Sequence, residues 1–364
     1  MRQWTIYLIL FLSLFIANCS QQKELITEPA VINWNDLLLK PKTDNDLCKL
    51  MQPKEIDDWE NIKRDFTTGL VVGFLPEHLS LPRRIAHETY WVNSKVQLSF
   101  NWLFWYPEGN ETPATLRLFV LMDEHQLDNA LPESGFYNDI NLKPGDDISI
   151  KVRIPPLDPG VHDVIVIGIP YPENSPDLYG SIVVTSRRVT LIAEPTTSPF
   201  REIGFTPLPA EGSIRKGDPS MSLELTLKND GIDVWNWPDP WLHVRTNRST
   251  PFYALTGHED VTNLDAPSMA PLNESFFTVL LFVDYQQIET VAGQMAFYGR
   301  VNSNTAFARI PLEIPPLPEG KHHILVLRID TPGVPMCILR GAPTERILPN
   351  SIYGKLVGIE VLPP

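Results

Sequence analysis

The segment Ile154-Pro155-Pro156-Leu157-Asp158-Pro159-Gly160-Val161-His162 returns 160 residues later as Ile314-Pro315-Pro316-Leu317-Pro318-Glu319-Gly320-Lys321-His322. An apolar run follows each copy, Val164-Ile165-Val166-Ile167 and Ile324-Leu325-Val326-Leu327. Two adjacent prolines cannot donate the backbone hydrogen bonds that a central strand needs. Each segment must therefore leave a strand, turn at its glycine and return as the next strand. The motif therefore predicts the same pair of β-strands in both halves of the chain.

Two further matches keep the same order along the chain. Upstream, Val120–Leu127 resembles Leu281–Ile288, and downstream Leu178-Tyr179-Gly180 resembles Ile352-Tyr353-Gly354. The last pair is 174 residues apart rather than 160, so the second half carries extra residues near Cys337. The sequence predicts two copies of one domain.

Strand patterns occur in both halves. Leu98, Phe100, Trp102 and Phe104 alternate with other residues, as expected of a strand with one buried face, and the segment 222–227 alternates in the same way. The 35 prolines argue against a helical protein, since proline breaks helices and collects in turns. Short strands separated by Pro-Gly turns predict an all-β protein built from tandem β-sandwiches.

The domain boundaries follow from this repeat. We expect a signal peptide at 1–18, a tether at 19–66, one sandwich at 67–196 (copy 1) and a second at 197–364 (copy 2). A Pro/Thr/Ser-rich linker around Glu194–Pro199 separates the copies, and Lys54–Phe66 is predicted to form a short helix in the tether. Each copy is long enough to be expected to fold alone.

The turn motif resembles the immunoglobulin-like and fibronectin III-like domains of bacterial surface proteins, many of which carry a Leu-x-Pro-Gly-x-His-like turn before a penultimate strand. This resemblance implies an immunoglobulin-like sandwich for each copy. The cysteine pair of antibody domains is absent, so the likeness concerns architecture.

The N-terminus has the pattern of an export signal. Arg2 precedes a nearly uninterrupted apolar run from Trp4 to Ala17, which is too short to cross a bilayer comfortably. The stretch Ile16-Ala17-Asn18-Cys19 resembles the bacterial lipobox, although Asn18 stands where glycine or alanine is usual. This resemblance implies cleavage before Cys19 and acylation of its thiol, hence an extracytoplasmic protein lipid-anchored to the cell membrane or outer membrane.

Charge limits the partners. The net charge of −14 argues against nucleic acid, whose binding depends on Lys and Arg at phosphates. We expect the membrane to be reached through the N-terminal lipid, and a protein or carbohydrate to be the other partner.

With Cys19 acylated, Cys48 and Cys337 remain. In an oxidising compartment they could form one disulfide between the tether and copy 2. The alternative is two separate buried thiols.

No catalytic or metal motif stands out, and no cofactor is expected. His162 and His322 occupy equivalent places, as do Asp123 and Asp284, but no His-Glu-x-x-His or paired Cys-x-x-Cys accompanies them. We interpret the histidines as turn caps or solvent-facing residues. A hydrolase whose site follows no known sequence order is the weakest alternative.

The cluster Val234-Trp235-Asn236-Trp237-Pro238-Asp239-Pro240-Trp241 has no counterpart in copy 1. Trp235, Trp237 and Trp241 could contact a ligand or partner, or could bury their indoles over the end of the sandwich. We therefore expect a non-enzymatic lipoprotein that acts as a binding or scaffold module. The alternative is a carbohydrate-binding or carbohydrate-active surface protein that uses this loop.

Overall fold

The structure of the protein is a computed structural model. It describes residues 29–32, 71–76, 83–170, 181–194, 198–213, 223–226, 241–258, 270–336, 339, 346–347 and 351–363, with short gaps inside several of these ranges. The signal peptide, the predicted helix at 54–66, and Cys19, Cys48 and Cys337 lie outside the described residues. Almost all described secondary structure is β-strand, which confirms the all-β prediction.

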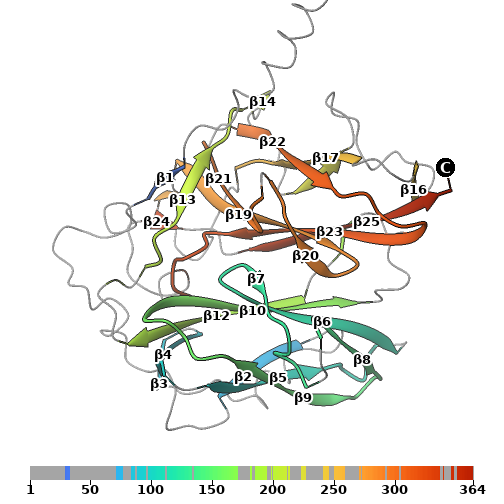
Figure 1. Ribbon diagram of the computed structural model, residues 1–364. Coiled ribbons are helices and arrows are strands. Elements are labelled where there is room, and N and C mark those ends of the chain that lie inside the picture. The colour runs from blue at the N-terminus through green and yellow to red at the C-terminus, as the bar shows by residue number, and fades with distance from the viewer. Residues whose placement is uncertain are drawn as a thin grey trace, which may run out of the picture.

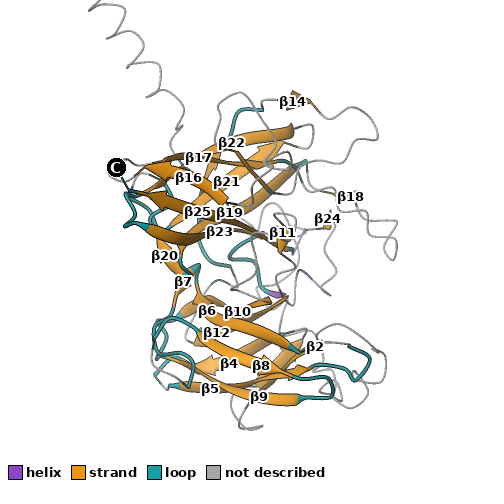
Figure 2. Cartoon of the chain, turned by 90° about the vertical axis from the view of Figure 1, so that its right-hand side faces the viewer, coloured by secondary structure: helices purple, strands orange, loops and turns teal. Residues whose placement is uncertain are grey.

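Copy 1 is a sandwich of two sheets (Figures 1 and 2). The outer sheet has the order β2-β5-β9, and the inner sheet has the order β3-β4-β12-β10-β6, with β7 and β8 also paired to β6. The strands are β2 (Val71–Pro76), β3 (Arg83–Ala86), β4 (Thr89–Asn93), β5 (Leu98–Trp105), β6 (Ala114–Met122), β7 (His125–Gln126), β8 (Asn138–Leu142), β9 (Asp147–Ile154), β10 (Gly160–Pro170) and β12 (Thr185–Glu194).

Copy 2 repeats this plan. Its outer sheet has the order β14-β22-β17-β15, and its inner sheet runs β1-β13-β21-β19-β23-β25, with β20 on β19 and both β11 and β16 on β25. The strands are β13 (Gly204–Pro207), β14 (Gly212–Ser213), β15 (Glu224–Thr226), β16 (Trp241–Arg245), β17 (Thr250–Thr256), β19 (Glu274–Val283), β20 (Gln286–Ile288), β21 (Ala296–Asn302), β22 (Thr305–Ile314), β23 (Gly320–Asp330) and β25 (Ile352–Leu362). A short pair, β18 (Ala270–Pro271) and β24 (Arg346–Ile347), stands apart.

The two copies have matching connectivity. The path β4-β12-β10-β6-β8 in copy 1 corresponds to β16-β25-β23-β19-β21 in copy 2, and β4 and β16 both pair in parallel with their neighbour. Ile154 and Ile314 both end an outer strand, and Gly160 and Gly320 both begin the next inner strand. The repeated motif therefore turns the chain from the outer sheet to the inner sheet in each copy.

Short segments cross between the copies. Strand β11 (Ser181–Ile182) lies between β10 and β12 in sequence but pairs with β25 of copy 2. Strand β1 (Ala30–Val31) precedes copy 1 yet pairs with β13 at the edge of the copy 2 inner sheet. The copies are therefore joined by strand pairing as well as by the linker.

The four sheets stack as four layers with the two inner sheets facing each other (Figure 1). Each copy has its own core, and a third core lies between the inner sheets. Burial follows this arrangement: the outer strand β5 alternates between buried and half-buried residues, whereas the inner strands β10 and β19 are buried along nearly their whole length. A strand covered on both faces needs apolar residues at successive positions. No helix among the described residues combines the length and the apolar character needed to cross a membrane.

Candidate functional site

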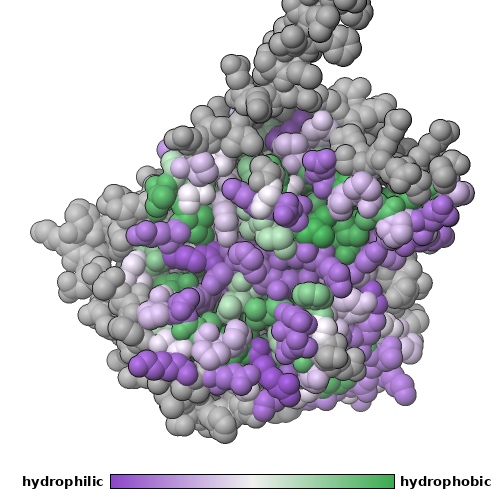
Figure 3. Space-filling model, viewed as in Figure 1, coloured by the Kyte–Doolittle hydropathy of each residue, from purple (hydrophilic) through white to green (hydrophobic). Residues whose placement is uncertain are grey.

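The junction between the inner sheets is the most distinctive region of the molecule. Its core joins both copies: Phe119, Leu121, Ile165, Ile167 and Ile169 from copy 1, and Leu280, Phe282, Tyr285, Ala296, Leu325, Leu327, Ile329 and Leu356 from copy 2. The rings of Phe119 and Phe282 pack across it with their centroids 5.2 Å apart. Hydrophilic residues run across the middle of the surface where the copies meet (Figure 3).

Two glutamines bridge the copies reciprocally. The main-chain N–H of Gln126 donates to Oε1 of Gln287 (2.6 Å), and the N–H of Gln287 donates to Oε1 of Gln126 (2.8 Å). Their side-chain amides reach further across, from Gln126 to the carbonyl of Tyr285 (2.8 Å) and from Gln287 to the carbonyl of Glu124 (2.7 Å). Each copy thus gives the other the same set of bonds.

Asp123 and His162 stabilise the turn of the repeated segment in copy 1 (Ile154–His162), which we call the motif turn. We call their paired contacts the brace. The two residues meet through Nδ1 of His162 and Oδ2 of Asp123 (2.6 Å), and Nε2 of His162 contacts the carbonyl of Asp158 (2.8 Å). Burial alone would lower the pKa of His162, but the Asp123 carboxylate outweighs it and raises that pKa. Both ring nitrogens can then donate, so the imidazolium ties the β6–β7 turn to the motif turn.

Copy 2 has the same brace. Nδ1 of His322 meets Oδ2 of Asp284 (2.7 Å), and Nε2 contacts the carbonyl of Pro318 (3.0 Å). Asp123 and Asp284 each also accept a bond from the main-chain N–H of the residue after the histidine. Both aspartates have positive φ, 51° and 47°, as does the residue that follows each of them. This is the geometry of a tight type I′ hairpin turn, which aspartate tolerates.

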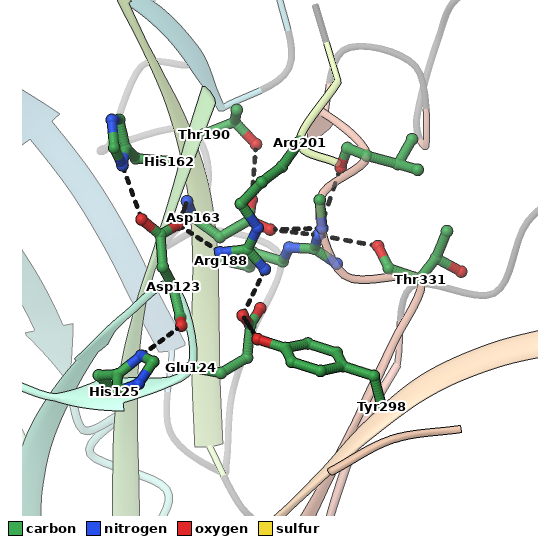
Figure 4. A network of polar contacts seen from close by, with 12 residues as sticks. Asp123, Glu124, His125, His162, Asp163, Arg188, Thr190, Arg201, Tyr298 and Thr331 are labelled. Carbon is green, nitrogen blue, oxygen red and sulfur yellow. Dashed lines mark hydrogen bonds and ion pairs between the residues drawn. The ribbon is translucent and has the colours of Figure 1, made fainter. Parts of the chain in front are cut away.

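A buried ion pair extends from copy 1 into copy 2 (Figure 4). Arg188 on β12 pairs with Asp163 on β10 at 2.7 Å, and both side chains are almost wholly buried. The guanidinium also donates to the main-chain carbonyls of Asp330, Thr331 and Val334 in copy 2. The carboxylate of Asp163 accepts from the N–H of Gly333 (3.1 Å). The extra residues of copy 2 therefore anchor on an ion pair of copy 1.

Arg201, near the start of copy 2, closes one end of the junction. Its guanidinium pairs with Asp123 and Glu124 of copy 1, and Glu124 also accepts a hydrogen bond from the hydroxyl of Tyr298 of copy 2 (2.8 Å). Burial raises the pKa of Glu124, which is fully enclosed. Burial would also raise the pKa of Asp123, but the hydrogen bond with His162 and the charge of Arg201 lower it instead.

The opposite end is aromatic. Arg117 forms a bidentate pair with Asp139 (2.7 Å for both bonds). Its guanidinium lies over the rings of Tyr137 (4.3 Å) and of Tyr285 from copy 2 (4.5 Å). Each end of the junction thus joins an arginine, a tyrosine and the second residue of the other copy's hairpin turn, which is Glu124 at one end and Tyr285 at the other.

The histidine side chains of this region contact other groups of the protein with both ring nitrogens. A histidine that serves as a general base needs a ring nitrogen facing its substrate, whereas both nitrogens of His162 and of His322 contact protein oxygens. No group of metal-ligating side chains suited to an ion occurs among the described residues. The contacts hold the two sandwiches in one relative position.

The structure leaves most of the predicted site residues undescribed. Trp235 and Trp237, like Cys19 and the proposed Cys48–Cys337 pair, are outside the described ranges. Trp241 begins β16 and is half-buried. Its ring meets His323 edge-on (5.6 Å between centroids), and the Lys321 ammonium lies 4.5 Å from the ring centroid. One face of this indole is thus covered by the protein's own side chains.

Sequence reasoning missed the polar contacts of the junction. The reciprocal glutamines were visible, because Gln126 and Gln287 occupy the same place in the repeat. Arg188 and Arg201 have no such signal, since each acts on a partner far away in sequence. The interpretation of the histidines as turn caps agrees with the braces described above.

No family model matches the chain, and the search of curated proteins found no match. Among solved structures, it resembles the fibronectin(III)-like modules of Clostridium thermocellum CbhA at 11% identity, covering 80% of this chain and 95% of that one, with a TM-score of 0.18. Red sea bream transglutaminase gives 8% identity, 84% and 33% coverage and a TM-score of 0.20. A β-glucosidase of Erythrobacter marinus gives 12% identity, 34% and 16% coverage and a TM-score of 0.18, so the chain spans 16% of that enzyme's length.

With its paired sheets and repeated connectivity, the chain is an all-β protein built from two β-sandwiches.

Proposed function

We propose that this protein is a lipid-anchored extracytoplasmic lipoprotein that acts as a rigid scaffold or binding module. The observation that carries the scaffold role is the core shared by the two inner sheets, together with the reciprocal glutamine bridge. Flexible tandem domains normally meet through small, polar interfaces. A junction with an apolar core and buried ion pairs instead favours one fixed spacing between the surfaces of copy 1 and copy 2.

Rigidity is testable with spin labels on the outer sheets. Arg153 on β9 and Glu313 on β22 are exposed and equivalent in the repeat. In a chain with Cys19, Cys48 and Cys337 replaced by Ser, labels at Arg153→Cys and Glu313→Cys should give one narrow distance distribution. A broad or bimodal distribution would refute the rigid scaffold.

The anchor is tested separately. Cys19→Ala should release the protein from membranes, because two acyl chains supply the stable attachment and each buried methylene contributes about 0.8 kcal/mol. Mass spectrometry of the mature wild-type N-terminus should find an acylated Cys19. An unmodified cysteine there would remove the anchoring half of the proposal.

The carbohydrate alternative rests on the tryptophan cluster. A sugar that stacks on Trp241 would have to displace Lys321, whose ammonium lies over that ring. The scaffold role is better supported because it needs no rearrangement. Titration with cello- and chito-oligosaccharides would favour the alternative if they bind and if Trp241→Ala abolishes binding without lowering the melting temperature.

A further inference from the structure

The junction has the geometry of a two-fold symmetric dimer interface. Gln126 and Gln287 exchange two hydrogen bonds with each other, and their side-chain amides donate two more to the carbonyls of Tyr285 and Glu124, so every donor and acceptor has its counterpart on the other side. Such reciprocity defines an isologous interface, in which the same patch on each side contacts its equivalent. Here both patches lie on one chain, so the axis relates copy 1 to copy 2.

The apolar contacts follow the same axis. Phe119 and Leu121 of copy 1 are equivalent to Leu280 and Phe282 of copy 2, so bulky and smaller side chains have changed places. Phe119 contacts Phe282, and the matching pair across the axis is Leu121 with Leu280. The fit depends on which two surfaces meet and is independent of whether one chain or two supply them.

We propose that the partner of this junction can be a second copy of the same chain, through exchange of domains. In such a dimer, copy 1 of each molecule packs against copy 2 of the other and both junctions are rebuilt. Every contact that holds the monomer is then made twice, so the dimer loses no interface contact. The monomer is favoured in dilute solution because a short linker gives the intramolecular partner an effective concentration in the millimolar range.

Several contacts favour packing of copy 1 against copy 2 over packing of two identical copies against each other. The guanidinium of Arg188 needs the carbonyls of Asp330, Thr331 and Val334, which belong to copy 2. The hydroxyl of Thr190 accepts from the N–H of Met336 (3.1 Å). The equivalent segment of copy 1 lies outside the described residues, whereas these bonds require the one in copy 2. We therefore expect dimers by exchange rather than dimers through two copy 1 faces.

The test uses two populations of the mature chain, each with Cys19, Cys48 and Cys337 replaced by Ser. One carries Gln126→Cys and the other Gln287→Cys, so each molecule holds a single thiol. The populations are unfolded, mixed at high concentration, refolded, diluted and treated with a short bis-maleimide. Domain exchange predicts a cross-linked product of twice the chain mass that joins the two populations, exceeding the product from either population alone by roughly tenfold.

Exchange is overturned if refolding gives monomers only, or if each population cross-links to itself as strongly as to the other. The matched control pair is Arg153→Cys with Glu313→Cys, equivalent positions on the outer sheets that should give no such product. The glutamine substitutions could weaken the junction themselves. Native mass spectrometry of unlabelled and isotope-labelled chains without the glutamine substitutions, refolded together, must therefore also show mixed dimers, and their absence would reject the proposal.

Discussion

His162 shows how a single side chain secures two turns. Its brace joins Asp123 at the β6–β7 hairpin to the carbonyl of Asp158 in the motif turn. The pKa of His162 is raised in the folded state, so its contribution to stability is full below the unfolded value of about 6.5 and is lost as the pH rises through the folded value. The pKa of Asp123 is lowered, so its contribution is full above about 3.8 and is lost as the pH falls.

The brace should therefore be strongest between about pH 3.8 and 6.5. We expect His162→Gln to lower the free energy of unfolding by about 1–3 kcal/mol in this window, because a hydrogen bond to a charged group is lost from a partly buried site. The difference from wild type should shrink at alkaline pH. Urea denaturation across the pH range measures it, and a difference that keeps growing as the pH rises above about 6.5 would contradict the assigned charge states.

Replacing Arg188 should lower the free energy of unfolding more than replacing His162. Arg188→Met leaves the Asp163 carboxylate buried without its charge partner, which costs about 3–5 kcal/mol. Adding Asp163→Asn should recover part of that loss, since the uncompensated charge is then gone. Chemical denaturation of both single variants and the double variant gives the coupling. Additive effects would show that Arg188 acts only through the carbonyls of copy 2.

At the scale of elements, the inner strands are buried on both faces, and this explains why the four sheets stack. Leu327 on β23 faces the core between the copies, and Leu312 on β22 faces the core within copy 2. Both are almost fully buried, so Leu327→Ala and Leu312→Ala should each cost about 2–5 kcal/mol through lost burial and cavity formation. Thermal unfolding compares them. A negligible loss for Leu327→Ala would mean that the junction contributes little to stability.

The strands also show which features of the fold the sequence predicts and which it does not. The alternation of Leu98, Phe100, Trp102 and Phe104 predicts a sandwich strand with one buried face, and β5 has that pattern. The run Val164–Ile167 lacks alternation, the signature of a strand covered on both sides, yet an apolar run does not name what covers it. The second cover is the other copy, known only once β10 and β23 are placed face to face. Arg188 and Arg201 were unpredictable for the same reason.

The whole molecule should unfold as one unit. A core shared by both inner sheets means that melting either copy exposes the apolar face of the other. We therefore expect a single cooperative transition by calorimetry, with equal calorimetric and van't Hoff enthalpies. Two resolved transitions would contradict this coupling.

Separation of the copies is a second test at this scale. The sequence alone led us to expect independent folding of 67–196 and 197–364, whereas the shared core argues against it. Each half would expose a continuous apolar sheet face of the kind that drives association. Size-exclusion chromatography should show oligomers or aggregates, and well-behaved monomers would restore the original expectation.

The swapped positions of phenylalanine and leucine in the two copies limit how the gene can change. A change in side-chain volume at position 119 is tolerated only if the side chain at position 282 still accommodates it, because the rings of Phe119 and Phe282 pack against each other. The two halves must therefore accumulate substitutions together, and recombination that replaces one half with a foreign counterpart would separate matched pairs. The unit that can move intact between genomes is the pair of sandwiches, although each sandwich has the size of an ordinary mobile module.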